Sequence, residues 1–457
     1  GVMNPQIFRE YDIRGIVGTD ITEEDVVLIG KGFGTYLQSE NRSRVSVGRD
    51  CRLSSDRFGE LLIEGLLATG CDVVDIGVCP TPVFYFSVGH LKTDGGVMIT
   101  ASHNPPEYNG FKLCSGHDTL FGSYIQRVRR IIDDGNFAEG SGKLETADVV
   151  GAYRKFLQDN ISVQRPLQVG IDAGNGTAGV VAVPVIRSLG CEVFGLCCEM
   201  DGRFPNHEPD PTVLKNMQDL IALVRQKELD VGFGYDGDGD RIGVVDKNGD
   251  IVWGDQLMIV YAREILSRKP GATFIAEVKC SQTLYDDIDK HGGKAIMWKT
   301  GHSLIKQKMK EVGAELAGEM SGHMFFADRY LGYDDAIYAS CRLLEILAAT
   351  GKTISQLLSD VPKTYTTPEI RVPCPDEVKF DLVKEVTDYF RRRNKVIDID
   401  GVRIPYEDGW GLVRASNTQP ALVLRFEALS EKRLSEIRSN VESVLAKLRE
   451  KHKGGRT

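Results

Sequence analysis

Three aspartates, Asp236, Asp238 and Asp240, alternate with glycines in a segment that ends at Arg241. Alternate side chains of an extended segment share a face, and the glycines allow the loop to curl until the carboxylates converge. Three such carboxylates repel one another unless a cation lies between them, which argues against a plain solvated turn. Hard oxygen ligands suit Mg²⁺ and leave coordination positions open for water or a phosphate. The segment therefore predicts a metal site.

Two other acidic-loop chemistries fit this segment less well. A calcium-binding EF-hand also begins with alternating aspartates, but it needs Gly at its sixth position and Glu at its twelfth. This chain has Arg241 and Lys247 at those positions. A phosphatase that forms an aspartyl phosphate through a D-x-D-x-T motif is closer, yet its threonine would fall on Asp240.

A serine lies in a second loop, Thr100 to Pro105, which follows an apolar stretch and ends at a proline. The hydroxyl of Ser102 is a candidate acceptor for a phosphoryl group. His103 is adjacent in sequence, so its side chain is expected to point away from Ser102, and the G-x-S-x-G motif of hydrolases is absent. Spacing alone leaves two alternatives open, a catalytic serine and a plain turn.

Two further loops combine groups that bind sugars and phosphates. In one, Glu319, Ser321 and His323 stand at alternating positions, so that a carboxylate, a hydroxyl and an imidazole can face sugar hydroxyls. In the other, Arg414 to Thr418, a guanidinium is followed by hydroxyls and loop N–H groups, a combination that suits a phosphate dianion. The alternative for the second loop is a surface turn.

Isolated cations are candidates for binding an anionic ligand in an otherwise acidic chain. They stand near glycines or loops, although each alone is more often a solvated surface charge. They are Arg14, Lys112, Lys279 and Lys299, with His302 beside the last.

A pattern that occurs three times predicts the elements that position these loops. Each copy begins with a short apolar strand, continues through a helix and reaches a second strand after a glycine, as in a βαβ unit. The first strands cover residues 45–50, 167–172 and 273–277. Each copy also contains a strand, a polar glycine-containing loop and a return strand. Because ligands of α/β sheets lie at the carboxyl ends of strands, we expect the three loops to face one cleft.

The chain changes character after Pro362, through a stretch that carries several prolines. A strand to Arg414, a strand from Ala421 to Phe426 and a final helix from about Glu431 to Lys451 predict a smaller α+β domain. The predicted fold class is therefore three similar α/β domains of βαβ type with mixed sheets, plus this domain, around one central cleft. The predicted boundaries are 1–148, 149–250, 251–362 and 363–457.

Composition narrows the class of protein. A chain of 457 residues is too long to fold around a single hydrophobic core, and 42% of its residues are hydrophobic. Both values predict several ordinary globular domains. A net charge of −9 argues against a nucleic-acid binder, which needs a basic surface. The ten cysteines include no C-x-x-C, so we expect buried free thiols in a reducing, cytoplasmic setting. Residues 1–15 contain no apolar region typical of a signal peptide, and no stretch approaches the roughly 20 apolar residues of a membrane span, so we expect no membrane targeting.

Taken in order, the four loops resemble those of the α-D-phosphohexomutase family, and most closely its bacterial phosphomannomutase/phosphoglucomutase branch. The likeness covers nearly the whole chain, including Tyr11 to Gly15 near the start. It implies an isomerase of carbohydrate metabolism, serving polysaccharide precursor synthesis, that interconverts hexose 1-phosphates and hexose 6-phosphates of mannose, glucose or both.

The resemblance also assigns roles to the candidate residues. It implies that Ser102 is a phosphoserine and that Asp236, Asp238 and Asp240 bind one Mg²⁺ per chain, together with a phosphate oxygen on Ser102. Residues implied to assist the transfer are Arg14, His103, Lys112, Arg241 and His302. Residues implied to bind substrate are Tyr11, Lys279, His302, Glu319, Ser321, His323, Arg414, Ser416, Asn417 and Thr418.

The mechanism implied by the resemblance is a relay. Phospho-Ser102 donates to a hexose monophosphate, the hexose 1,6-bisphosphate turns over, and its other phosphate returns to the serine. Because turning over requires a cleft that loosens, we expect the last domain to move as a hinged lid. The expected partners are phosphorylated hexoses, with no nucleic acid and no membrane, and the expected state is a monomer or weak dimer.

Three alternatives remain open. A mutase of glucosamine or N-acetylglucosamine phosphates is the nearest, although the glucosamine branch typically has Gln where this chain has Met320. A non-catalytic sugar-phosphate binding protein would be expected to lack Ser102 or a metal carboxylate, and this chain keeps them all. A metal-dependent phosphatase would release inorganic phosphate from glucose 1-phosphate.

Overall fold

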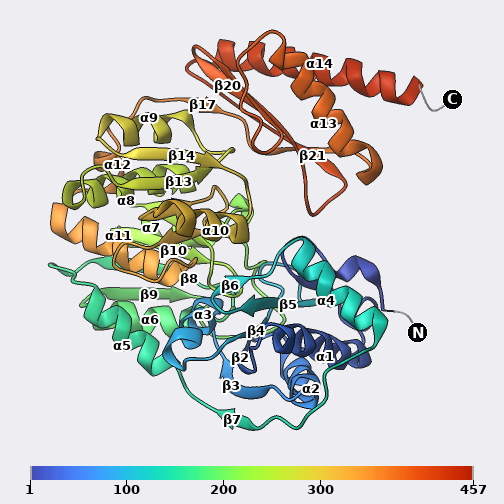
Figure 1. Ribbon diagram of the computed structural model, residues 1–457. Coiled ribbons are helices and arrows are strands. Elements are labelled where there is room, and N and C mark those ends of the chain that lie inside the picture. Colours follow the sequence, from blue (N-terminus) through green and yellow to red (C-terminus); the bar gives the residue numbers. More distant parts are fainter. Residues whose placement is uncertain (1–2, 455–457) are drawn as a thin grey trace.

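The computed structural model describes residues 3–454, with side chains described as far as residue 452, and arranges them as four sheets that follow one another along the chain (Figure 1). The first sheet has seven strands in the order β1-β5-β4-β2-β3-β7, with β6 paired to β5. Its strands are β1 (Ile13–Ile16), β2 (Arg44–Arg49), β3 (Asp72–Val78), β4 (Gly95–Ile99), β5 (Tyr108–Ser115), β6 (Asp118–Thr119) and β7 (Leu144–Thr146).

The second and third sheets are smaller. The second has the order β12-β11-β10-β8-β9, and its strands are β8 (Gln168–Asp172), β9 (Glu192–Leu196), β10 (Val231–Tyr235), β11 (Ile242–Asp246) and β12 (Ile251–Val252). The third has the order β14-β13-β15-β16, and its strands are β13 (Thr273–Glu277), β14 (Lys294–Trp298), β15 (Leu316–Gly318) and β16 (Met324–Phe326).

The same four-strand pattern runs through all three sheets. In each, two parallel neighbours flank the first strand of the copy, and a hairpin adds the antiparallel return strand at one side: β5-β4-β2-β3, β11-β10-β8-β9 and β16-β15-β13-β14. The predicted threefold repeat of βαβ units with mixed sheets is confirmed. The three loops of interest are the hairpin connections β4–β5, β10–β11 and β15–β16.

Helices cover the faces of these sheets (Figure 1). Their starts carry local signals: Thr22 and Asp25 form a capping box at the start of α1, and the Asp335 carboxylate accepts from the Tyr338 N–H in the first turn of α11. The helices of the first three domains are α1 (Glu23–Ser39), α2 (Ser55–Ala68), α3 (Thr81–His90), α4 (Ser123–Asp134), α5 (Val150–Asn160), α6 (Gly179–Ser188), α7 (Gln218–Lys227), α8 (Gly254–Arg268), α9 (Gln282–Lys290), α10 (His302–Val312), α11 (Ala336–Thr350) and α12 (Ile354–Leu357). Short 3-10 turns are η1 (Pro5–Ile7) and η2 (Leu214–Met217).

The last domain is an antiparallel sheet in the order β17-β21-β20-β19, with β18 also paired to β21 and two helices packed on it. Its elements are β17 (Tyr365–Thr366), β18 (Ile370–Pro373), α13 (Asp376–Arg391), β19 (Val402–Tyr406), β20 (Gly409–Ala415), β21 (Ala421–Ala428) and α14 (Glu431–Gly454). The predicted α+β domain is confirmed. Its final helix runs past the predicted end near Lys451 because no proline or glycine interrupts it before Gly454.

The hydrophobic cores divide the molecule unequally. One buried cluster is continuous from the first sheet through the second to the third, and includes Phe84, Tyr153, Phe233 and Tyr338. The last domain has a separate core around Leu382 and Phe426. The first three domains therefore pack against one another through one large hydrophobic core, whereas the last domain is attached through a smaller contact.

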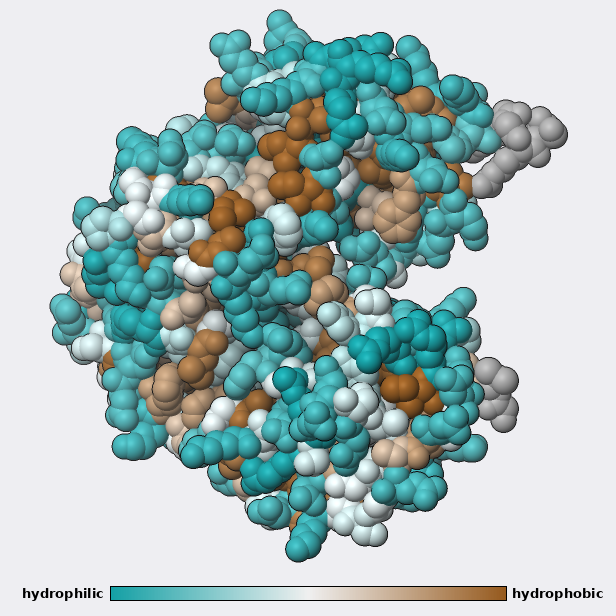
Figure 2. Space-filling view, in the orientation of Figure 1, coloured by the Kyte–Doolittle hydropathy of each residue, from teal (hydrophilic) through white to brown (hydrophobic). Residues whose placement is uncertain are grey.

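That smaller contact centres on Arg403, which is buried although it is charged. Its guanidinium donates to the backbone oxygens of Val278 and Cys280 at 2.7 Å each, and stacks on Trp410 with 3.8 Å to the ring centroid. Because these N–H groups are hydrogen-bonded, the free-energy cost of burying the guanidinium charge is offset. Across a deep notch the last domain faces the first, as the space-filling view shows (Figure 2). Among residues 3–454 no helix has the length and apolar character that a bilayer crossing requires.

Candidate active site

Ser102 stands just beyond β4 in a backbone conformation that serine seldom adopts. Its φ of 55° is left-handed, and its N–H donates to Oγ1 of Thr100 at 2.9 Å, which helps to hold the turn. A residue other than glycine in this conformation is strained. Such a conformation persists only where the surrounding structure fixes it, and these positions are often functional sites. The turn directs the buried Ser102 side chain toward the next domain.

The Ser102 hydroxyl meets the aspartate loop of that next domain. Its Oγ lies 2.9 Å from Oδ2 of Asp236 and 2.6 Å from Oδ1 of Asp238. The two loops also touch through their backbones: a Cβ added at Gly237 would lie 2.2 Å from the Ser102 carbonyl oxygen, so only glycine fits there. The spatial meeting of serine and aspartates, which the repeat predicts, is present.

The three aspartates converge at the end of β10. Donor oxygens of Asp236, Asp238 and Asp240 all lie within 4.8 Å of one another, and each residue is at most 1% exposed. The N–H groups of Asp240 and Arg241 both donate to Oδ1 of Asp236 at 3.1 Å, which curls the loop. Oδ1 of Asp240 is buried without a hydrogen-bond donor, although a carboxylate oxygen requires one. This unsatisfied oxygen and the carboxylate set fit a hard divalent cation.

Lys112, from β5, partly balances the three negative charges. Its Nζ lies 2.7 Å from Oδ2 of Asp238 and 2.7 Å from Oδ2 of Asp240. Burial alone would lower the pKa of Lys112, but the two carboxylates raise it well above its ordinary value. Burial alone would raise the pKa of Asp238, but the lysine and donors from Ser102 and Thr81 hold it well below the ordinary value. Burial and the other two aspartates raise the pKa of Asp236.

Two histidines lie beyond the aspartates in the third domain. Nδ1 of His323 lies 3.0 Å from a carboxylate oxygen of Asp334, and Nε of Arg241 donates to its Nε2 at 3.1 Å. Burial alone would lower the pKa of His323, but the Asp240 and Asp334 carboxylates raise it. The His302 ring lies beside it, with ring centroids 5.8 Å apart, and burial lowers its pKa well below the ordinary value. The surroundings of the two rings thus shift their pKa values in opposite directions.

His103, next to Ser102 in the serine loop, also lines the cavity. Burial lowers the pKa of His103 well below its ordinary value, and its Nδ1 is buried without a hydrogen-bond partner.

The third loop holds Glu319 behind the cavity wall. One carboxylate oxygen of Glu319 accepts from the N–H of Gly301 at 3.1 Å, and burial raises its pKa. Met320 and Ser321 line the cavity itself. The Met320 N–H donates to Glu277 at 3.0 Å, so the hairpin is held against the end of β13.

The fourth loop comes from the last domain. Arg414 pairs with Asp400 at 3.2 Å and is buried, while the Ser416 Oγ accepts from the N–H of Thr418 at 3.2 Å. Asn417 reaches across to the first domain, where its Nδ2 lies 3.3 Å from the hydroxyl of Tyr11. That hydroxyl also donates to the Thr300 carbonyl at 3.1 Å.

These loops surround a cavity of about 650 Å³. Predicted site residues that line it are Tyr11, Arg14, Ser102, His103, Lys112, Asp240, Arg241, Lys279, His302, Ser321, His323 and Thr418. Predicted residues outside the lining are Asp236 and Asp238, which lie behind the serine hydroxyl, Glu319, and three residues of the fourth loop, Arg414, Ser416 and Asn417. The last three instead bind Asp400, their own loop or Tyr11.

Sequence reasoning missed several lining or supporting residues. Asp12, which accepts from Nε of Arg14 at 2.9 Å, and Asp334 orient predicted side chains. Glu369, which pairs with Lys279 at 3.2 Å, and Arg371 come from a stretch read only as a linker. Arg425 lies among apolar residues of β21 and lines the cavity. A charged residue in an apolar strand is a sequence signal that could have identified it.

Cations outnumber carboxylates around the cavity, despite the acidic chain. Those that line it include Arg9, Arg14, Lys279, Arg371 and Arg425, spread over the first, third and last domains. Guanidinium groups suit phosphate oxygens because they offer several donors in a plane. The arrangement can hold a dianion at each end of a sugar-sized molecule, with a serine and a metal site at one end.

Four family descriptions match successive parts of the chain. They are Phosphoglucomutase/phosphomannomutase alpha/beta/alpha domain I over residues 5–139, domain II over 151–249, domain III over 253–365, and the C-terminal domain over 369–444.

Individual relatives are similar over almost their full length. Phosphomannomutase/phosphoglucomutase of Pseudomonas aeruginosa is 46% identical over 434 residues, which cover 95% of this chain and 94% of the relative. Phosphoglucomutase of Neisseria gonorrhoeae is 42% identical over 446 residues, 96% of each chain. The crystal structure of a phosphoglucomutase/phosphomannomutase family protein from Burkholderia thailandensis superimposes with a TM-score of 0.93 at 42% identity, and 98% of each chain is covered.

Proposed function

The chain belongs to the phosphoglucomutase/phosphomannomutase family, and we propose that it transfers a phosphoryl group between O1 and O6 of a hexose by way of Ser102. Membership makes it an isomerase of the phosphohexomutase type. The proposed substrates are the 1- and 6-phosphates of mannose, glucose or both. Family membership favours this function over a non-catalytic binding protein.

One observation carries the proposal. The Ser102 hydroxyl lies 2.9 Å from Asp236 and 2.6 Å from Asp238, at the edge of a cavity lined by cations. Phosphoryl transfer requires alignment of the reacting atoms and neutralised oxygen charge rather than strong covalent activation. A serine fixed by a strained turn supplies the alignment, and Lys112 together with the metal site supplies the charge.

The proposed first step starts from phosphorylated Ser102. A sugar hydroxyl attacks phosphorus, the bond from phosphorus to Oγ of Ser102 breaks, and the hydroxyl proton passes to a base near the sugar. The electron pair returns to Oγ, and Lys112, whose ammonium pairs with Asp238 and Asp240, is assigned to balancing the charge at this end of the cavity. In the return step Oγ attacks the other phosphate of the hexose 1,6-bisphosphate and regains a phosphoryl group.

Mg²⁺ is the proposed cofactor, one per chain, held by Asp236, Asp238 and Asp240 together with a phosphoryl oxygen on Ser102. When bound, it supplies positive charge that draws electron density from the phosphoryl oxygens. The carboxylate donors and the unsatisfied Oδ1 of Asp240 support this choice over a softer metal.

Proton transfer is assigned to the two histidines of the third domain. His302 has a lowered pKa, so its neutral imidazole can accept the sugar hydroxyl proton. His323, whose pKa the Asp240 and Asp334 carboxylates raise against the effect of burial, is assigned to donating to the departing oxygen once Arg241 has left its Nε2. Arg14, His103 and Arg241 line the reaction end and are assigned to stabilising phosphoryl charge.

Sugar and distal phosphate are assigned to the third and last domains. Glu319 and Ser321 are proposed to hold sugar hydroxyls, with Tyr11 and Lys279 beside them. Thr418 lines the cavity, and Arg414, Ser416 and Asn417 support it from behind. We propose that closure of the last domain turns these groups toward the idle phosphate.

The sugar branch is the finer part of the proposal. Met320 lines the cavity between Glu319 and Ser321, and it offers no hydrogen bond to an amino or acetamido group. This favours mannose and glucose phosphates over their 2-amino counterparts. The expected setting is the cytoplasm and the expected state is a monomer or weak dimer, with the domain boundaries at 148, 250 and 362.

The test is a substrate comparison with Mg²⁺ and a trace of glucose 1,6-bisphosphate. Glucose 1-phosphate, mannose 1-phosphate and glucosamine 1-phosphate are supplied separately, and the 6-phosphates and inorganic phosphate are measured. We expect 6-phosphates from the first two, little from the third, and little free phosphate. Release of phosphate at the rate of isomerisation would indicate a phosphatase instead.

Replacement of the serine tests the route. Ser102→Ala removes the atom to which phosphorus bonds, so turnover should fall by about four orders of magnitude or more. Ser115→Ala, on the same hairpin but away from the aspartates, is the matched control and should keep most of its activity. A Ser102→Ala enzyme with near-normal turnover would remove Ser102 from the reaction path.

A further inference from the structure

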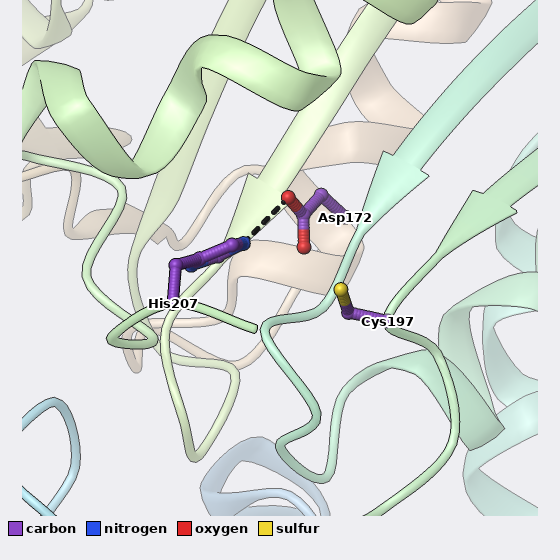
Figure 3. Close-up of side chains that lie close together, drawn as sticks. All are labelled: Asp172, Cys197 and His207. Atoms are coloured by element: carbon purple, nitrogen blue, oxygen red, sulfur yellow. Dashed lines mark hydrogen bonds and ion pairs between the residues drawn. The ribbon is translucent and has the colours of Figure 1, made fainter. Parts of the chain in front are cut away.

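A second group of metal-binding side chains lies outside the active-site cavity, on the second domain. Asp172 at the end of β8, Cys197 just after β9, and His207 in the long loop before η2 point toward one another (Figure 3). Their donor atoms all lie within 4.8 Å of one another. Three different segments supply three different ligand types, which is not the composition of an acidic surface cluster.

The His207 ring is oriented as it is in protein metal sites. Its Nδ1 lies 2.7 Å from the carbonyl oxygen of Glu208, and its Nε2 lies 2.8 Å from Oδ2 of Asp172. A hydrogen bond from Nδ1 to a backbone carbonyl sets the ring orientation and the tautomer that leaves Nε2 available to a metal. The carboxylate is positioned too, because Oδ1 of Asp172 accepts from the N–H of Gly174 at 2.9 Å.

A nucleophilic cysteine is the competing interpretation, and the geometry argues against it. A cysteine–histidine–aspartate triad needs one ring nitrogen for the thiol and the other for the carboxylate. Here Asp172 and the Glu208 carbonyl occupy both nitrogens of His207. Burial and neighbouring negative charge also raise the pKa of Cys197 to about 11, so the thiol is not activated.

The local charge favours a cation. Asp219, in the first turn of α7, acts electrostatically on both Cys197 and His207, in addition to Asp172. A thiolate, an imidazole and a carboxylate would carry two negative charges, which matches a divalent ion. Soft thiolate and imidazole donors select zinc over magnesium.

We propose that Asp172, Cys197 and His207 form a binding site for a zinc-class divalent cation, separate from the Mg²⁺ site and independent of the proposed function. Tetrahedral zinc sites with nitrogen, sulfur and oxygen ligands place donors about 3.3–3.6 Å apart, given Zn–N and Zn–S bonds of about 2.0 and 2.3 Å. The imidazole and carboxylate therefore move apart slightly as the ion replaces the proton between them. A water molecule completes the tetrahedron.

Binding exchanges protons for the ion. Metal ligands bind in their deprotonated forms, so the ion displaces the proton of the Cys197 thiol and any proton that His207 shares with Asp172. Titration calorimetry in buffers of different ionisation enthalpy counts these protons. The Mg²⁺ site, built from aspartates, would release none from a histidine or a cysteine.

The decisive experiment uses Co²⁺ as a spectroscopic probe, with reduced protein in excess Mg²⁺ to occupy the aspartate site. We expect one equivalent of Co²⁺ to produce a thiolate-to-cobalt charge-transfer band that Zn²⁺ then abolishes. Cys197→Ser should lose the band. Cys198→Ser is the matched control, because its Sγ donates to the Ile171 and Leu196 carbonyls, and it should keep the band.

Two more variants separate this site from the active site. His207→Gln should weaken Co²⁺ binding at least tenfold, whereas Asp238→Asn should leave the band unchanged although it impairs the Mg²⁺ site. Absence of the band in the unmodified protein, or its persistence in Cys197→Ser, would overturn the proposal. Neither result would bear on Ser102.

Discussion

Asp334 places a carboxylate oxygen 3.0 Å from Nδ1 of His323, while Nε of Arg241 approaches the opposite nitrogen of the same ring at 3.1 Å. The histidine is thus held between a carboxylate of its own domain and a guanidinium of the neighbouring one. Asp334 itself does not line the cavity. In the proposed mechanism Asp334 therefore acts by orienting His323.

Asp334→Asn should lower kcat about 10- to 100-fold while KM changes little, because substrate contacts remain and only the orientation and charge state of a proton-transfer group suffer. Steady-state kinetics with glucose 1-phosphate measure both constants. Asp334→Glu keeps the charge and should recover part of kcat. Equal changes in kcat and KM for both variants would indicate a general loss of packing.

Lys112→Met should destabilise the protein by about 3–5 kcal/mol in chelator, because it leaves Asp238 and Asp240 buried without their cation. Saturating Mg²⁺ should reduce this loss, since the ion supplies the missing positive charge. Urea unfolding with and without Mg²⁺ gives both values. Lys310→Met removes an exposed pair with Asp118 and should cost less than about 1 kcal/mol in either buffer.

Arg403→Ala should loosen the last domain from the third. The guanidinium satisfies two carbonyls at 2.7 Å and stacks on Trp410, so its loss leaves buried acceptors unpaired. Hydrogen exchange should rise along β19 and β20, with smaller changes in the first three domains. Asn417→Ala breaks only the single contact with Tyr11 and should leave that exchange pattern unchanged.

Gly30→Ala tests the close crossing of α1 and α2. An added Cβ would lie 2.4 Å from the Leu62 carbonyl and 3.0 Å from the Cα of Gly65, so the helices must separate, at a cost of about 1–3 kcal/mol or more. Gly151→Ala, in α5, meets nothing within 4 Å and should stabilise by about 0.5–1 kcal/mol. Thermal unfolding should move in opposite directions for the two.

His207→Gln should show a pH-dependent loss of stability in metal-free buffer. The hydrogen bond to Asp172 raises the pKa of His207 from 6.5 to about 9, so the charged imidazole stabilises the fold fully below about pH 6.5 and loses this effect as pH rises through about 9. The side chain is half-buried, so we expect a gap of about 1–2 kcal/mol at pH 6. The gap should close toward pH 10, and a constant gap would contradict the assignment.

Much of the architecture could be predicted because it rests on local pattern. The periodicity of apolar residues and the glycines between elements predicted three copies of a βαβ unit. The hairpin loops β4–β5, β10–β11 and β15–β16 lie where that pattern predicted them. The spacing of Asp236, Asp238 and Asp240 predicted their convergence for the same reason, since alternate residues share a face.

What escaped prediction depends on contacts between distant segments. The left-handed φ of Ser102 and the pairing of Asp334 with His323 have no local signature. Arg371 faces the cavity only because β18 joins the edge of β21. Seven of the ten cysteines are buried as expected, but Cys51, after β2, and Cys197 and Cys198, after β9, are only partly buried.

The separate core of the last domain has an evolutionary consequence. Because its interior is packed around Leu382 and Phe426, and few side chains bind it to the rest, substitutions inside it are absorbed locally. A lineage can therefore remodel this module while Ser102 and the three aspartates, which lie in the first and second domains, keep their positions. The last domain and the loops that hold the serine and the aspartates are thus free to diverge at different speeds.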